Sequence, residues 1–308
     1  MQNLNLFIRF FLIANMCLHP ILGFGQQVKN VPEAFESLSV EPKIILINNQ
    51  ILVPTEGGHM QGVQVIEKNG KERLLISGSS LTKAYILQAD LTTLKTDTLI
   101  ILRQEPYRHA GGIQASEPYL VVGIEDNVIK KSSKVCLYNY HNTNLSNAQS
   151  NITIDREGEA KHKTAGATGL LALDNNCLIV VSNWDSRNWD FYRTNPKKNE
   201  YKMLESFAAP DDWASYQSIN LIMDEEAIYA IGFYRKELVD SADLILVSKR
   251  GTFNLIMEKV LTKIFNSKNG VDFGTAAGLQ VDKKGKLHVW ATQSDALKKI
   301  TVNQFSQL

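Results

Sequence analysis

The sequence has little of what would place it in a specialised class of protein. Only three of its 308 residues are cysteine, no run of Lys and Arg is longer than two, and helical periodicity is weak outside residues 257–265, where a short helix could form. With 33 basic and 32 acidic residues the net charge is +1, which argues against a nucleic-acid partner. The 44% hydrophobic and 21% charged content is that of a soluble globular protein.

The few cysteines exclude a disulfide framework. Cys17 lies near the N-terminus, and Cys136 and Cys177 each lie inside an apolar run typical of a β-strand. We expect the latter two to be buried free thiols, which behave as small hydrophobic residues. A single disulfide between them is the alternative in an oxidising compartment.

The N-terminal residues have the pattern of a secretory leader. Arg9 precedes an apolar stretch over 10–18, and the small residues Gly23 and Gly25 follow before Gln26. This predicts a signal peptide over 1–25, a linker over 26–42, and a secreted or periplasmic protein. The stretch is too short for a membrane span, so we expect no transmembrane segment in the mature chain. A buried N-terminal helix is the alternative, and the residues before Cys17 do not favour a lipid-modified cysteine.

A six-residue segment recurs five times along the remaining chain. Its copies occupy 59–64, 109–114, 163–168, 215–220 and 275–280. The fourth position is small each time and recurs in steps of 50, 54, 52 and 60 residues, at Gly62, Gly112, Gly166, Ser218 and Gly278. A period near fifty is the length of one propeller blade.

Each copy is followed by further β-rich runs separated by turn residues. The second runs lie at 73–77, 119–123, 177–182, 227–233 and 286–292, and third and fourth runs follow in most units, the fourth unit's last run being 253–257. The last unit lacks a fourth run, which residues 43–53 can supply. We therefore predict an all-β chain, a single five-bladed β-propeller of four-stranded antiparallel blades over 43–308, closed by an N-terminal strand that joins the C-terminal blade.

The repeated segment predicts what surrounds the propeller axis. The position after the small residue is apolar in every copy and should point into the blade, because side chains alternate along a strand. The next position is polar in all five copies and should line the axial channel: Gln64, Gln114, Thr168, Asn220 and Gln280. The first position is also polar and should ring one mouth: His59, His109, Lys163, Ser215 and Thr275.

Two interpretations of these rings remain open. In one, the polar side chains hydrogen-bond ordered water in a narrow tunnel. In the other, the mouth is a ligand site, where His59 and His109 on adjacent blades could hold a metal or perform acid–base chemistry. The matching positions offer no third metal ligand, so the sequence defines no metal site and specifies no cofactor.

Tryptophans beside carboxylates form the second candidate region. Trp184 and Trp213 lie in segments expected to be loops and should be exposed, where they could stack on a ligand, whereas Trp189 should begin a strand and pack between blades. The candidate ligand-binding residues are therefore His59, His109, Gln64, Gln114, Lys163, Gln280, Trp184 and Trp213.

Over residues 43–308 the chain resembles the five-bladed β-propellers, a shape shared by carbohydrate-binding lectins and glycan-cleaving enzymes. The glycosidases of this shape carry acidic residues on the inner strands, whereas the equivalent positions here carry histidine, lysine and hydroxyl groups. The resemblance implies a monomeric exported module that binds a glycan, peptide or small molecule at the channel mouth. The alternative is a secreted hydrolase or lyase that uses His59 and His109, with or without a metal.

Overall fold

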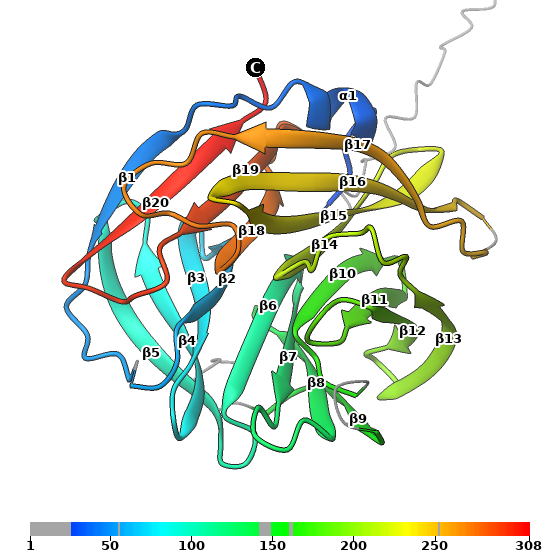
Figure 1. Cartoon of the computed structure of the whole chain (residues 1–308), viewed down its shortest axis with the longest axis horizontal. Coiled ribbons are helices and arrows are strands. Elements are labelled where there is room, and N and C mark those ends of the chain that lie inside the picture. The colour runs from blue at the N-terminus through cyan, green and yellow to red at the C-terminus, as the bar shows by residue number, and fades with distance from the viewer. Residues whose placement is uncertain (1–25, 55, 142–148, 160–162, 252) are drawn as a thin grey trace, which may run out of the picture.

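The computed structural model describes residues 26–54, 56–141, 149–159, 163–251 and 253–308, and the predicted signal peptide with Cys17 lies outside them. In these residues the chain forms twenty strands and one short helix. Five blades surround a common centre (Figure 1), as the repeat predicted. The all-β prediction and the blade number are therefore confirmed.

Each blade has four antiparallel strands, and in blades 1 to 4 these follow chain order. Blade 1 contains β2 (Met60–Lys68), β3 (Lys71–Ser79), β4 (Lys83–Asp90) and β5 (Lys95–Gln104). Blade 2 contains β6 (His109–Ser116), β7 (Tyr119–Glu125), β8 (Ser132–Asn139) and β9 (Ile152–Glu157). Blade 3 contains β10 (Ala167–Leu173), β11 (Asn176–Ser182), β12 (Asn188–Asn195) and β13 (Glu200–Ala208). Blade 4 contains β14 (Ser218–Met223), β15 (Ala227–Lys236), β16 (Val239–Lys249) and β17 (Glu258–Phe265).

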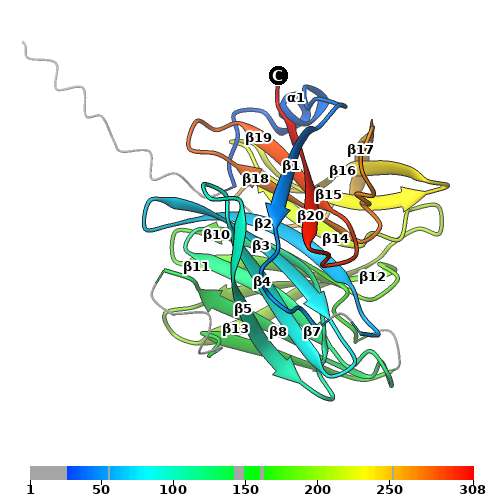
Figure 2. The ribbon, with the colours of Figure 1, turned by 90° about the vertical axis from the view of Figure 1, so that its left-hand side faces the viewer.

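Blade 5 joins the two ends of the described chain. It contains β18 (Ala276–Val281), β19 (Leu287–Thr292), β20 (Lys299–Ser306) and, as its outer strand, β1 (Lys43–Asn48). β1 is antiparallel to β20, with Lys43 opposite Gln304 and Asn48 opposite Lys299. The two strands run side by side in Figure 2. The predicted closure is confirmed, and it leaves β20 with a partner on both edges.

The outer strand of blade 4 differs from the prediction. Residues 258–265 form β17 rather than a short helix, and residues 253–257, predicted as the fourth strand, precede it. The side chains of β17 alternate between exposed and partly buried, which is the two-residue period of a strand. β-branched Val260, Thr262 and Ile264 favour that conformation, and pairing with β16 fixes it.

Residues 26–42, predicted as a linker, pack on the propeller. They include α1 (Val31–Glu36), whose N-terminus is capped by Asn30, because the Asn30 side-chain oxygen accepts a hydrogen bond from the Glu33 amide. Val31 and Phe35 share one helix face and are buried against strands of blades 4 and 5. The segment is therefore part of the folded body.

The hydrophobic core is divided into five clusters, one between each pair of neighbouring blades. The apolar residue after each small position takes part in these clusters as predicted, and all five are fully buried: Val63, Ile113, Ala167, Ile219 and Leu279. Packing between blades therefore fixes the inner strands, and with them the side chains at the axis.

Candidate functional site

The predicted amides lie at the axis, but they connect blades instead of lining an open passage. Gln64 is fully buried, and its amide nitrogen donates to the Asn220 side-chain oxygen of blade 4 at 3.0 Å. The Gln64 side-chain oxygen accepts from the Ala115 amide of blade 2 at 3.0 Å. Asn220 also accepts from the Leu279 amide of blade 5. One pair of side chains thus links four blades.

Gln114 makes a second set of links. Its amide nitrogen donates to the Leu221 carbonyl at 2.6 Å, and its oxygen accepts from the amides of Leu170 and Leu221, each at 2.6 Å. The backbones also meet here, since a Cβ on Gly112 would lie 2.9 Å from the Gln217 carbonyl oxygen across the axis. The partners of Gln114 are backbone groups of neighbouring strands, so the described inner strands close the axis.

Two other residues predicted to bind a ligand form polar contacts with residues of the blades. The Gln280 side-chain oxygen accepts from the indole nitrogen of Trp290 in its own blade at 3.0 Å. Lys163 lies 3.7 Å from a carboxylate oxygen of Asp190, which also accepts from Arg156 of blade 2 at 2.6 Å. Both side chains therefore have structural partners where the structure places them.

The two histidines meet at the mouth. His59 precedes β2, His109 begins β6, and their ring centroids lie 6.3 Å apart in an edge-to-face arrangement. The Gln61 amide nitrogen lies 2.8 Å from Nδ1 of His59. Equivalent positions on adjacent blades were expected to be neighbours, and the inner strands bring them together.

A buried carboxylate completes this group. Glu125, the last residue of β7, is directly opposite His109 in the sheet register and is fully buried. Nδ1 of His109 lies 3.2 Å from Oε1 of Glu125, within ion-pair distance though not aligned as a hydrogen bond. The other Glu125 oxygen accepts from the Ala165 amide at 2.7 Å. Sequence reasoning missed Glu125, whose one signal was an acidic residue ending an apolar strand.

The surroundings of His59 favour its neutral form. Burial lowers the pKa of His59, and the nearby His109 ring lowers it further, while the Met60 carbonyl and the Asp295 carboxylate act in the opposite direction. A histidine with a pKa below its usual value of about 6.5 is uncharged at neutral pH and can accept a proton.

The three tryptophans whose exposure was predicted from the sequence differ in how far they are exposed. Trp184 is 44% exposed at the rim of blade 3, with Nζ of Lys130 4.0 Å from its ring centroid. Trp213 was predicted to be exposed, and that prediction is wrong: it is 8% exposed and packs against Trp189 and Phe207. The loop that carries Trp213 packs on blade 3, because Arg187 of that blade donates hydrogen bonds to backbone carbonyls of the loop, including that of Trp213 at 2.8 Å. Trp189 is fully buried, as predicted.

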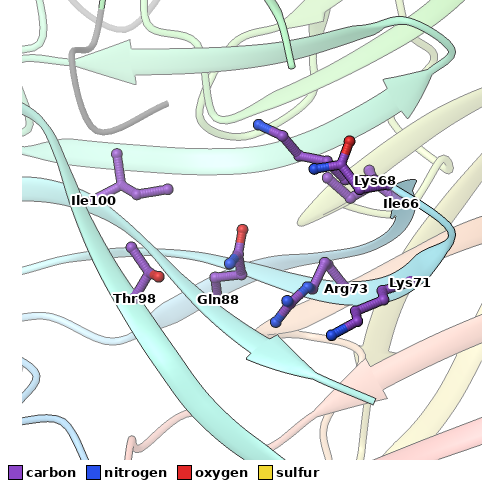
Figure 3. Close-up of a pocket in the computed structure, with 8 residues that line it drawn as sticks. Ile66, Lys68, Lys71, Arg73, Gln88, Thr98 and Ile100 are labelled. Atoms are coloured by element: carbon purple, nitrogen blue, oxygen red, sulfur yellow. The ribbon is translucent and has the colours of Figure 1, made fainter. Parts of the chain in front are cut away.

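Two cavities lie away from the mouth, at the opposite end of the blades. The first, of about 320 Å³, is formed by the four strands of blade 1 and is lined by Lys71, Arg73, Gln88 and Thr98 among others (Figure 3). Arg73 forms ion pairs with Asp90 and Asp97, which offset its charge. The second, of about 250 Å³, lies between blades 3 and 4 and borders the buried thiol of Cys177. Cys136 and Cys177 are both free thiols, as expected.

The described residues contain no group of three or more His, Cys, Asp or Glu side chains arranged to hold a metal ion. They also contain no helix long and apolar enough to cross a membrane.

No protein-family model and no curated protein sequence matches the chain. Among solved structures, it is similar to the catalytic domain of the Coprinopsis cinerea GH62 α-L-arabinofuranosidase, with 9% identity, a TM-score of 0.51, and coverage of 85% of this chain and 98% of that one. It is also similar to a GH43 endo-arabinanase from Bacillus licheniformis, with 10% identity, a TM-score of 0.49, and coverage of 82% and 96%.

A bifunctional GH43-CE protein from Bacteroides eggerthii matches with 7% identity and a TM-score of 0.43, over 87% of this chain and 32% of that one, so this chain spans about a third of that protein's length. The likeness to the GH62 domain supports a fold and not an activity. The chain is a five-bladed β-propeller that shares its architecture with this solved glycoside hydrolase domain.

Proposed function

We propose that the protein is a carbohydrate-active hydrolase or lyase whose proton transfers are performed by His59 and His109. One observation carries the proposal: the His59 imidazole, whose pKa is lowered, lies 6.3 Å from the His109 imidazole, and Nδ1 of His109 lies 3.2 Å from a buried carboxylate oxygen of Glu125. Acid–base catalysis needs two groups of this kind within reach of one substrate. The group lies at the end of the axis where the inner strands β2 and β6 begin.

The two histidines would have different roles. His59 is uncharged at neutral pH and would take a proton from water or from a sugar carbon. His109 would return a proton to the leaving oxygen, with the buried Glu125 carboxylate, 3.2 Å from its Nδ1, as the group that positions its ring. The protein would then differ from glycosidases that use paired carboxylates.

The choice of a carbohydrate substrate rests on fold analogy. The solved proteins that share this architecture are named as arabinofuranosidase and endo-arabinanase. The exposed face of Trp184 supports the choice, since aromatic rings commonly stack on sugars.

The test is a polysaccharide and oligosaccharide panel, read by new reducing ends for hydrolysis and by the ultraviolet absorbance of unsaturated products for elimination. We expect turnover by the native protein and a loss of about 10²-fold or more in kcat for His59→Gln and for His109→Gln. His288→Gln is the matched control, because His288 is bonded to Asp282 and Ser306 in blade 5 and should leave turnover unchanged.

Saturable glycan binding without turnover on any substrate would overturn the proposal and leave a non-catalytic binding module. Turnover that survives both histidine substitutions would also overturn it.

The lowered pKa of His59 predicts a specific dependence of stability on pH. The unfolded chain binds a proton at His59 below about pH 6.5, whereas the folded protein does so only at lower pH. The free energy of unfolding should therefore fall as pH drops from about 6.5 through the folded-state pKa, and this contribution is fully present above 6.5. Urea unfolding between about pH 8 and pH 5 would measure it.

His59→Gln removes this titration. The difference in stability between native protein and variant should shrink as pH falls, and a difference that is constant across the range would contradict the lowered pKa.

A further inference from the structure

We propose that the mouth face of the propeller docks on an anionic lipid membrane through five hairpin tips, one from each blade. The tips connect the second and third strands of the blades. Each is taken as the connecting loop with the strand residue on either side of it: 79–83, 125–132, 182–188, 236–239 and 292–299. They lie at the end of the blades where the inner strands begin, because β7 ends opposite the start of β6 and β8 starts opposite the end of β7. The same register holds in the other blades.

Every tip exposes at least one large apolar side chain. Their exposed fractions range from 42% at Val239 to 83% at Leu238, and the full set is Leu81, Val128, Ile129, Trp184, Leu238, Val239 and Leu297. A single exposed apolar residue is ordinary on a protein surface. Exposed apolar residues at the same loop of all five blades are not ordinary. They form a ring of apolar tips around the mouth that contains the histidines.

The opposite face provides an internal comparison. The turns between the first and second strands there consist of Asn69-Gly70, Glu117-Pro118, Asp174-Asn175, residues 224–226 and residues 282–286. These turns expose no large apolar side chain. The exposed apolar side chains of the mouth-face tips therefore have no counterpart in these five turns.

Each tip also carries basic residues beside its apolar ones. The five tips hold seven basic residues against five acidic ones, a net charge of +2 on a chain whose total is +1. Lys131, Lys236, Lys298 and Lys299 are exposed. Lys130 lies over the Trp184 ring, so cation and aromatic are presented together.

This combination fits a lipid surface. A bilayer interface meets side chains from five separate blades at once, accepts apolar and tryptophan side chains below the headgroups, and attracts adjacent lysines to anionic headgroups. Docking would turn the mouth toward the headgroups. The inference stands on surface residues alone and does not depend on the catalytic roles of His59 and His109.

Trp184 provides a local probe, because the other three tryptophans are at most 8% exposed. The full chain would be mixed with vesicles of phosphatidylcholine and phosphatidylglycerol, some carrying bromine on their acyl chains. We expect a blue shift and bromine quenching of tryptophan emission, both absent from Trp184→Phe and much weaker with pure phosphatidylcholine. This readout reports on the tips whatever residues 1–25 contribute to vesicle binding.

Sedimentation with the same vesicles measures affinity. Lys298→Gln and Lys299→Gln should each weaken binding to anionic vesicles by about fivefold. Combined replacement of Val128, Ile129, Leu238 and Leu297 by serine should abolish the emission shift. The matched control replaces Leu94 and Leu308, which are exposed outside the tips, by serine, and it should bind as the native protein does.

Three results would overturn the inference: no binding to anionic vesicles, binding without quenching of Trp184, or equal weakening by the tip variant and by the control. A soluble protein partner that protects the tips while vesicles do not would overturn it as well.

Discussion

Replacing Gln114 with leucine is expected to lower the free energy of unfolding by about 3–6 kcal/mol. The side chain is fully buried, and it satisfies the carbonyl and amide of Leu221 on blade 4 and the amide of Leu170 on blade 3. Leucine has a similar size but offers no hydrogen bond. Each backbone group left buried without a partner costs about 1–3 kcal/mol, and the extra apolar burial offsets part of that.

Chemical denaturation of native protein and variant, monitored by circular dichroism, would give the difference. Gln104→Leu is the matched control, because Gln104 is exposed at the end of β5 and its replacement should change stability by no more than about 0.5 kcal/mol. If Gln114→Leu and Gln104→Leu lower the free energy of unfolding by equally small amounts, water satisfies the backbone groups at the axis. The Gln114 side chain then does not join the blades.

The fold could be predicted because its signal recurs. A small residue followed by an apolar and a polar one, about every fifty residues, marked the inner strands. The missing fourth strand of the last blade identified residues 43–53 as its partner, and 43–48 form that strand. The sequence pattern of a single segment was insufficient to predict its secondary structure where no repeat supported it. Residues 258–265 suited either a strand or a short helix until pairing with β16 decided.

The site could be predicted only in part. Strand equivalence placed His59 beside His109, since both begin the same segment of adjacent blades. Glu125 could not be found that way, because its position depends on the register between β6 and β7. Trp213 was misplaced for a similar reason: the bonds from Arg187 that hold its loop come from a residue 26 positions away.

Replacing Glu125 is expected to have the largest effect on the mouth. Glu125→Ala leaves the His109 ring and the Ala165 amide without their buried partner, which should lower the free energy of unfolding by about 3–5 kcal/mol. Glu125→Gln keeps the size and one acceptor oxygen but removes the charge. It should fold, and it should lower kcat by about 10²-fold or more, because it removes the negative charge 3.2 Å from Nδ1 of His109.

The chain offers its own control for this pair. Glu117 lies 3.1 Å from Nε2 of His141 with its side chain 61% exposed, so the same two residue types meet in solvent. Exposed pairs contribute about 1 kcal/mol or less, and Glu117→Gln should leave both stability and turnover near native values. A double-mutant cycle of Glu125→Gln with His109→Gln isolates the buried interaction. If His109→Gln costs as much turnover in the Glu125→Gln background as in the native protein, the two residues act independently, and the carboxylate does not position the imidazole.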